Sequence, residues 1–168
     1  EVILQGQNPQ IQPAANATLK ACKSNCMGQN LLDTVGPTGA NGEFTTMALA
    51  TNNMPLDGYL DVTKTGNRRT LIFPASPIVA DTANVPVLML SNSLVAALAI
   101  VGINQTPGNS IVGLLVTDCQ NMPIAGAVAV VTQGGQPVGN VVDASQFDAT
   151  LAGAFLVFDV QPGVTSAG

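Results

Sequence analysis

The sequence predicts an all-β protein built from two small sandwich modules in tandem. Short runs rich in Val, Ile, Leu and Thr recur along the chain, and such runs are typical of half-buried strands. Seventeen glycines and eleven prolines separate them, as the turns of a sandwich or barrel require. With 168 residues, the chain is long enough for one ordinary domain or for two modules that each bury a core.

Several segments are candidate strands because each combines such residues with a turn signal at its ends. They are residues 2–4, 17–21, 42–47, 58–63, 70–73, 86–90, 111–117, 127–132, 138–142, 154–158 and 164–166. The turn signals between them include Asn41-Gly42, Thr65-Gly66-Asn67, Gln133-Gly134-Gly135 and Gln161-Pro162-Gly163. Gly, Asn and Pro are the residues that tight turns demand.

One segment predicts a short helix over residues 92–101. Ser91-Asn92-Ser93 offers a helix N-cap, and Gly102 is suited to the left-handed conformation that ends a helix. The segment is apolar on every side, so we expect it to be buried. With the polar loop 103–109 it divides the chain into a first module, 1–90, a helix and linker, 91–109, and a second module, 110–168.

The second module carries a fuller motif that begins around Asp118. Its residues are Val116, Asp118, Pro123, Ile124, Ala125, Gly126, Ala127, Ala129, Val130, Gly153, Phe155, Val160, Pro162 and Gly163. This pattern resembles the carboxypeptidase regulatory-like domains found in secreted and surface proteins of bacteria. The resemblance covers residues 111–168 and, more loosely, 17–90. It implies that both modules are Ig-like, transthyretin-like β-sandwiches.

Such domains usually continue with another strand after the Pro-Gly pair. Here only residues 164–168 follow Gly163. Three explanations stay open: the last strand is short, the chain has been cut, or another chain completes the sheet.

The composition excludes several classes of partner. Only 9% of residues are charged, five of them Lys or Arg, and the net charge is −5. Nucleic-acid binding needs a basic footprint, so we predict none. No apolar run reaches the length of a membrane span. A surface so poor in charge is weakly protected against self-association. It suits a subunit that packs against copies of itself, or a face that carries sugar.

The residue types also argue against catalysis. The chain has no histidine, which removes Ser-His-Asp and Cys-His arrangements and the commonest general base. We therefore predict no enzyme activity and no cofactor. Asp143 and Asp148 flank a loop and are candidate Ca²⁺ ligands, although solvated loop carboxylates are the simpler interpretation. The cluster Asn67-Arg68-Arg69 is interpreted as a solvated hairpin tip.

Three cysteines leave at least one unpaired within the chain. Cys22 and Cys26 flank a segment that favours a turn, which brings the two close enough for a local disulfide. A bridge from either residue to Cys119 would close a longer loop and stabilise more, but nothing in the sequence places those residues together. We predict that Cys22 and Cys26 are bonded and that Cys119 is free and at least partly buried.

Two sequons mark candidate N-glycosylation sites. They are Asn16-Ala17-Thr18 and Asn104-Gln105-Thr106, and each borders a predicted loop. Asn104 is the better candidate because its loop should be exposed.

These observations favour a non-enzymatic extracellular or cell-surface structural protein that assembles through the edges of its sheets. An open edge is a template for another chain's strand. The apolar segment Val2-Ile3-Leu4 is the candidate strand donor. The alternative is a monomeric adhesion or carbohydrate-binding module with its site on loops such as 65–69 and 133–137. Sugar-binding platforms usually present exposed aromatic side chains, and this chain has one Tyr and no Trp.

Overall fold

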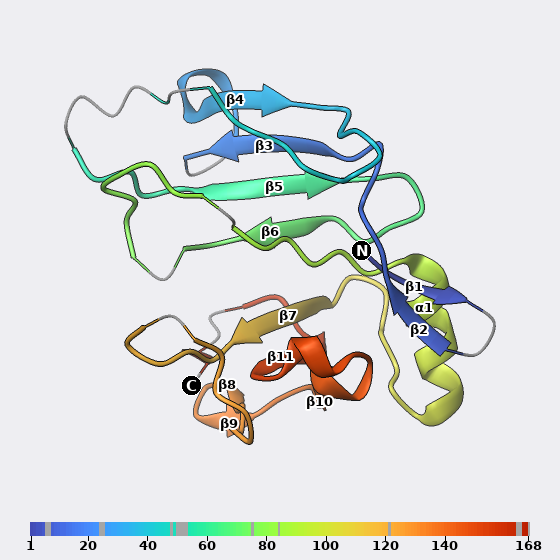
Figure 1. Ribbon diagram of the computed structural model, residues 1–168. Coiled ribbons are helices and arrows are strands. Elements are labelled where there is room, and N and C mark those ends of the chain that lie inside the picture. Colours follow the sequence, from blue (N-terminus) through green and yellow to red (C-terminus); the bar gives the residue numbers. More distant parts are fainter. Residues whose placement is uncertain are drawn as a thin grey trace. The chain divides into compact units, whose positions relative to one another are not determined.

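The computed structural model describes residues 1–5, 8–23, 26–47, 49, 54–74, 76–83, 85–120, 122–163 and 166–167 (Figure 1). Their regular structure consists mainly of strands, with one short α-helix and a few 3-10 turns, which fits the predicted all-β class. The chain forms two compact units, the first of Glu1–Ile3 and Ile11–Asn92, the second of Leu4–Gln10 and Ser93–Gly168. The division into modules 1–90 and 110–168 remains a prediction about independent folding units.

The first unit is built on a four-stranded antiparallel sheet. Its strands are β3 (Thr18–Cys22), β4 (Leu31–Val35), β5 (Tyr59–Thr63) and β6 (Thr70–Ile72), in the order β4-β3-β5-β6. Alternation along β5 sends Leu60 and Val62 to one face and Tyr59 and Asp61 to the other. Leu60 and Val62 belong to the core of the unit.

The inner face of this sheet is covered by chain that forms no strands. Leu19 and Val62 on the sheet are buried with Met89, and Phe44 and Val87 pack against them. The strands predicted at 42–47 and 86–90 are therefore wrong, although both segments do supply core residues. The backbone N–H of Met47 donates to the Asp33 carboxylate rather than to a neighbouring strand (2.9 Å), and Pro86 has no N–H to offer a ladder.

The second unit contains two small antiparallel sheets. The larger has the order β10-β11-β7, from β7 (Ser110–Leu115), β10 (Asn140–Asp143) and β11 (Ala154–Val160). The smaller has the order β12-β8-β9, from β8 (Val131–Gln133), β9 (Gln136–Pro137) and β12 (Ser166–Ala167). Val131 of the smaller sheet packs against Val157 and Val160 of the larger. Phe155 and Phe158 are buried and fill the core of this unit.

The strand predicted at 127–132 is mostly irregular chain. Only β8 forms, beginning at Val131, and the Val128 side chain is 80% exposed. Gly126 has a φ of +75° and no neighbour within 4 Å of the position of a Cβ. Gly126 therefore makes a left-handed turn with no other chain segment packed closely against it.

The predicted helix is present but only partly buried. Helix α1 (Asn92–Leu98) continues as one 3-10 turn (Ala99–Val101), and Gly102 ends it in the left-handed conformation with a φ of +87°. Leu94, Val95 and Leu98 are buried, whereas Ile100 is 87% exposed. The expectation of an all-round buried helix is wrong, because Ala96 and the last turn are exposed.

Three further strands were not predicted: β2 (Asn8–Ile11), which pairs with β1 (Val2–Gln5), and the strands β4 and β9. In the predicted last strand, 164–166, residues 164 and 165 lie outside the described residues, and β12 begins at Ser166.

Candidate functional site

The edges of the sheets are the candidate site for assembly. The outer strands of the sheet in the first unit are β4 and β6, and those of the larger sheet in the second unit are β10 and β7. Strand β7 has six residues with no charge and no proline, whereas β6, which also lacks both, has only three residues. No charged residue occurs anywhere between Asp81 and Asp118 in the sequence. An uncharged edge lacks the features with which proteins usually block strand addition.

The candidate donor segment Val2-Ile3-Leu4 lies in β1 and is held by its own chain. The N–H of Val2 donates to the carbonyl of Met89 (2.8 Å), and the N–H of Ser91 donates to the carbonyl of Val2 (3.1 Å). The Val2 side chain is fully buried. In this conformation Val2 is not available to another chain, so donation requires the segment to leave its place.

The carboxylate of Glu1 anchors the start of β1. It accepts hydrogen bonds from Lys64 Nζ (2.6 Å), Asn67 Nδ2 (2.8 Å) and Gln12 Nε2 (3.0 Å). Burial raises the pKa of this carboxyl, but the hydrogen bonds from Lys64, Gln12 and Asn67 outweigh burial and leave the pKa below its usual value. The charged form of Glu1 is therefore the one that the fold stabilises.

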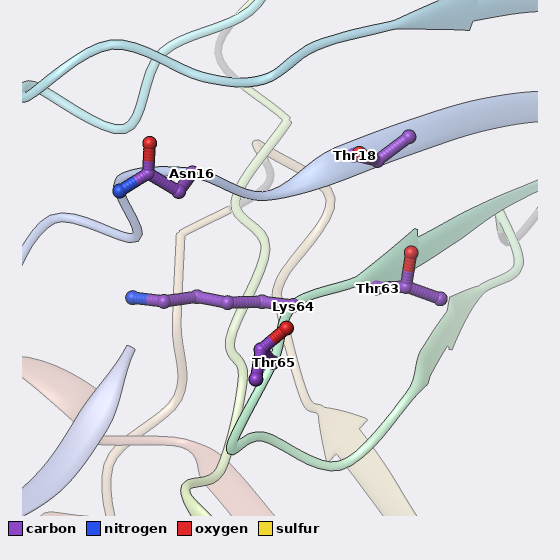
Figure 2. A pocket seen from close by; sticks show the side chains of 5 residues that line it. All are labelled: Asn16, Thr18, Thr63, Lys64 and Thr65. Atoms are coloured by element: carbon purple, nitrogen blue, oxygen red, sulfur yellow. The ribbon is translucent and has the colours of Figure 1, made fainter.

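A shallow, open hollow of about 360 Å³ lies where β3 begins beside the end of β5 (Figure 2). Figure 2 shows Asn16 and Thr18 on one segment and Thr63, Lys64 and Thr65 on the neighbouring one. The lining groups are an amide, three hydroxyls and an ammonium already bound to Glu1. This set can donate and accept hydrogen bonds, and it contains no paired nucleophile and base.

The two sequons differ in their surroundings. Asn16 is exposed with a φ of +60°, and its backbone N–H donates to the carbonyl of Thr38 (3.0 Å). Asn104 is also exposed, and its amide reaches the carbonyl of Gly102 at 3.5 Å. The Asn side chains that would carry the glycan are thus both exposed to solvent. Glycosylation at either sequon remains a prediction.

The structure pairs Cys22 with Cys26 in a disulfide, with the two Cα atoms 4.8 Å apart, as predicted. Cys119 is free and exposed, so the expectation that it is partly buried is wrong. Asp118 explains the exposure, because its carboxylate accepts the N–H groups of Gln120 and Met122 (both 2.9 Å). The resulting turn carries Cys119 at its surface.

The carboxylates of Asp143 and Asp148 cap two short 3-10 turns, Ala144–Gln146 and Ala149–Leu151. Asp143 accepts the N–H of Ser145 (2.9 Å) and Asp148 accepts the N–H of Thr150 (2.8 Å). Hydrogen bonds from the side chain and then the backbone of Ser145 hold the pKa of Asp143 below its usual value, and those of Thr150 do the same for Asp148. In the ranges that the structure describes, no group of three or more acidic or Cys side chains is arranged to hold a metal ion.

The cluster Asn67-Arg68-Arg69 is not simply a solvated tip. Asn67 binds Glu1, and Arg69 forms two hydrogen bonds to the carboxylate of Asp61 (both 2.8 Å). The hydrogen bonds and charge of Asp61 raise the pKa of the Arg69 guanidinium further. Two of the three side chains, Asn67 and Arg69, are therefore bound to carboxylates of the first unit. Within the part of the chain that the structure describes, the Arg68 side chain forms no such hydrogen bond.

An aromatic pair lies on the outer face of the first sheet. The ring centroids of Tyr59 and Phe73 are 5.2 Å apart with an angle of 31° between the rings, and Phe73 is 67% exposed. Asp61 and Leu71 are the next cross-strand pair on that face. Sequence reasoning missed this pair because only the β5–β6 register brings the two residues together.

Asp159 is a second feature that the sequence did not reveal. Its carboxylate accepts the N–H of Thr106 and the amide of Asn109 (both 2.8 Å), and its own N–H donates to Gln105 Oε1 (2.9 Å). Asp159 has a φ of +64° at an irregularity in β11. The polar loop 103–109 is therefore fixed to β11.

Comparison with protein-family models, with curated proteins and with solved structures finds no match to this chain. Among the described residues, no helix has the length and apolar character needed to cross a membrane.

Proposed function

We propose that this chain is a non-enzymatic extracellular structural protein that self-assembles through β-strand edge pairing. On this proposal its two units act as tandem Ig-like, transthyretin-like modules of the carboxypeptidase regulatory-like kind, on a cell surface or in a filament. The observation that carries it is the uncharged edge strand β7.

The charge distribution supports the proposal. Like charges and exposed Lys, Asp or Pro residues normally keep sheet edges apart. The stretch between Asp81 and Asp118 has none of the charges, and it contains the whole of β7. A surface of this kind favours association over the monomeric state.

The test is the particle mass as a function of concentration. Light scattering and sedimentation should give a mass that rises above 17.0 kDa with concentration, and negative-stain images should show repeating particles. A mass that stays at the monomer value up to millimolar concentration would contradict the proposal.

Carbohydrate binding is the second candidate, and the Tyr59–Phe73 pair specifically favours it. An exposed ring offers an apolar face for a sugar, and the Asp61–Arg69 pair beside it offers polar groups. Titration with soluble β-linked glucose and N-acetylglucosamine oligomers would detect it, with Phe73→Ala as the variant and Phe44→Ala, on the core side, as the control. Binding that is lost in Phe73→Ala and kept in Phe44→Ala would favour this function. The absence of any binding to the native protein would exclude it.

A further inference from the structure

Strand β7 is the one outer strand of the two larger sheets without a protective feature in the described ranges. Strand β6 has three residues and is soon followed by Pro74. Strand β4 carries Asp33, whose carboxylate binds Met47. Strand β10 has four residues and ends at Asp143. Short length, charge and proline are the usual ways of blocking an edge, and β7 has six residues, Ser-Ile-Val-Gly-Leu-Leu, with neither charge nor proline.

The backbone of β7 directs a row of groups away from its neighbour. The N–H of Val116, just after the strand, donates to the carbonyl of Gly153 on the β11 side (2.9 Å). Because backbone groups of an antiparallel strand point alternately to its two sides, the N–H groups of Ile111, Gly113 and Leu115 point away from β11. Within the described residues no hydrogen-bond partner occupies that side.

We propose that this edge pairs with β7 of a second copy of the chain, antiparallel and centred on Gly113. This inference rests on the proposed function and names the surface that performs it. The pairing places Ile111 opposite Leu115 of the second copy, and Val112 opposite Leu114. The backbone groups that point outward meet their own counterparts, so the contact is self-complementary, as a twofold interface requires.

The side chains of β7 fit such a pairing. Every opposed pair is apolar, and apolar cross-strand pairs stabilise a sheet. At the centre, Gly113 is exposed, so its backbone groups are open to the second copy. Leu115 is 53% exposed in the single chain and gains a partner in the pair. The result is one sheet that runs from β10 of the first copy to β10 of the second.

The test uses two substitutions at one position. Gly113→Pro removes the N–H at the centre of the contact, whereas Gly113→Ala keeps it. An added Cβ meets only Leu156 Cδ2, at an ordinary distance of 3.9 Å, so the alanine should fit. Since the twofold contact loses a donor from each copy, Gly113→Pro should raise the dissociation constant by about thirtyfold. Gly113→Ala should leave it within about threefold of the native value.

A matched proline on the other edge controls for general damage. Val141 lies opposite Val157 of β11. The backbone groups of Val157 point toward Val112 of β7, on the other side of β11. The N–H of Val141 therefore points away from the sheet. Val141→Pro should therefore leave the association unchanged. Far-ultraviolet circular dichroism shows whether each variant folds. If Gly113→Pro does not, Gly113→Lys takes its place, because two ammonium groups at the twofold axis should separate the copies at low salt.

Each outcome decides the matter. Association weakened by Gly113→Pro or Gly113→Lys, and by neither control, supports the β7 pair. Native association that survives both variants, or that Val141→Pro disrupts instead, overturns the β7 pair but leaves the proposed function standing. A native protein that is monomeric at every concentration overturns both.

Discussion

At the scale of single residues, Asp159 has the clearest structural role in the second unit. Its carboxylate gathers the hydrogen bonds of Thr106 and Asn109, and the φ of +64° at Asp159 is one that Asn also tolerates. The backbone and the charge can therefore be tested separately at this position.

Asp159→Asn should loosen the loop 103–109 without straining the backbone. Asp159→Ala should loosen the loop and also strain the backbone. In the native protein the hydrogen bonds from Thr106, and then from Asn109, hold the pKa of Asp159 below its usual value. The contribution of Asp159 to stability is therefore present above the unfolded pKa of about 3.9 and is lost as pH falls through the lower folded pKa. The amide chemical shift of Thr106, followed by NMR during acid titration, should report this transition. A Thr106 shift that titrates identically in Asp159→Asn would contradict the assignment.

The cysteines give a second residue-scale prediction. A non-reduced digest should yield one peptide pair joined through Cys22 and Cys26, because these residues are bonded. Cys119 should react with a maleimide in the native protein, since it is free and exposed. Any fragment that links Cys119 to either of the others would show the pairing to be wrong.

At the scale of elements, the turn before β10 depends on Gly139. Its φ is +77°, and a Cβ there would lie 2.6 Å from both the carbonyl oxygen of Phe158 and Val157 Cγ1. Gly126 has nearly the same φ, +75°, but nothing near the position of a Cβ. The two glycines therefore separate backbone strain from crowding.

Gly126→Ala should lower the free energy of unfolding by about 1–2 kcal/mol, the cost of a left-handed alanine. Gly139→Ala should lower it by about 3 kcal/mol or more, because overpacking adds to that strain. Urea denaturation of both variants measures the difference. Equal losses would mean that the chain near Phe158 relaxes freely.

Local signals predicted some elements well and others poorly. Gly134 and Gly135 have φ values of +58° and +79°, as the hairpin between β8 and β9 requires, and a Gly-Gly turn is legible in the sequence. The segments 42–47 and 86–90 have strand composition but form no extended ladder, and the bonds of 86–90 to β1 stop at a single bridge between Leu90 and Val2. Strand β4 was missed because Asp33 and the polar residues before it obscure its alternation.

The candidate sites divide in the same way. The local disulfide between Cys22 and Cys26 could be predicted, since five residues of chain determine it. Three other contacts could not be predicted, because each depends on residues that are distant in sequence. They are the Tyr59–Phe73 pair, the Glu1–Lys64 ion pair and the hydrogen bonds of Asp159 to the loop 103–109. The prediction that Val2 is free to join another chain missed its hydrogen bond to Met89 for the same reason, because Met89 is distant in sequence.

At the scale of the whole molecule, the low charge makes a prediction about salt. If association uses backbone hydrogen bonds and apolar pairs, screening has little to weaken. The dissociation constant should change by less than about threefold between about 0.05 and 0.5 M NaCl. Sedimentation at both ionic strengths measures it, and a large loss of association at high salt would indicate ion pairing instead.

The central claim is that the chain associates through an open sheet edge, and backbone hydrogen exchange tests it most directly. Exchange at Ile111, Gly113 and Leu115 should slow as protein concentration rises, because their N–H groups gain partners in the associated form, while exchange at the amides of β6 should stay constant. Association that rises with concentration while those three amides exchange at an unchanged rate would contradict the account.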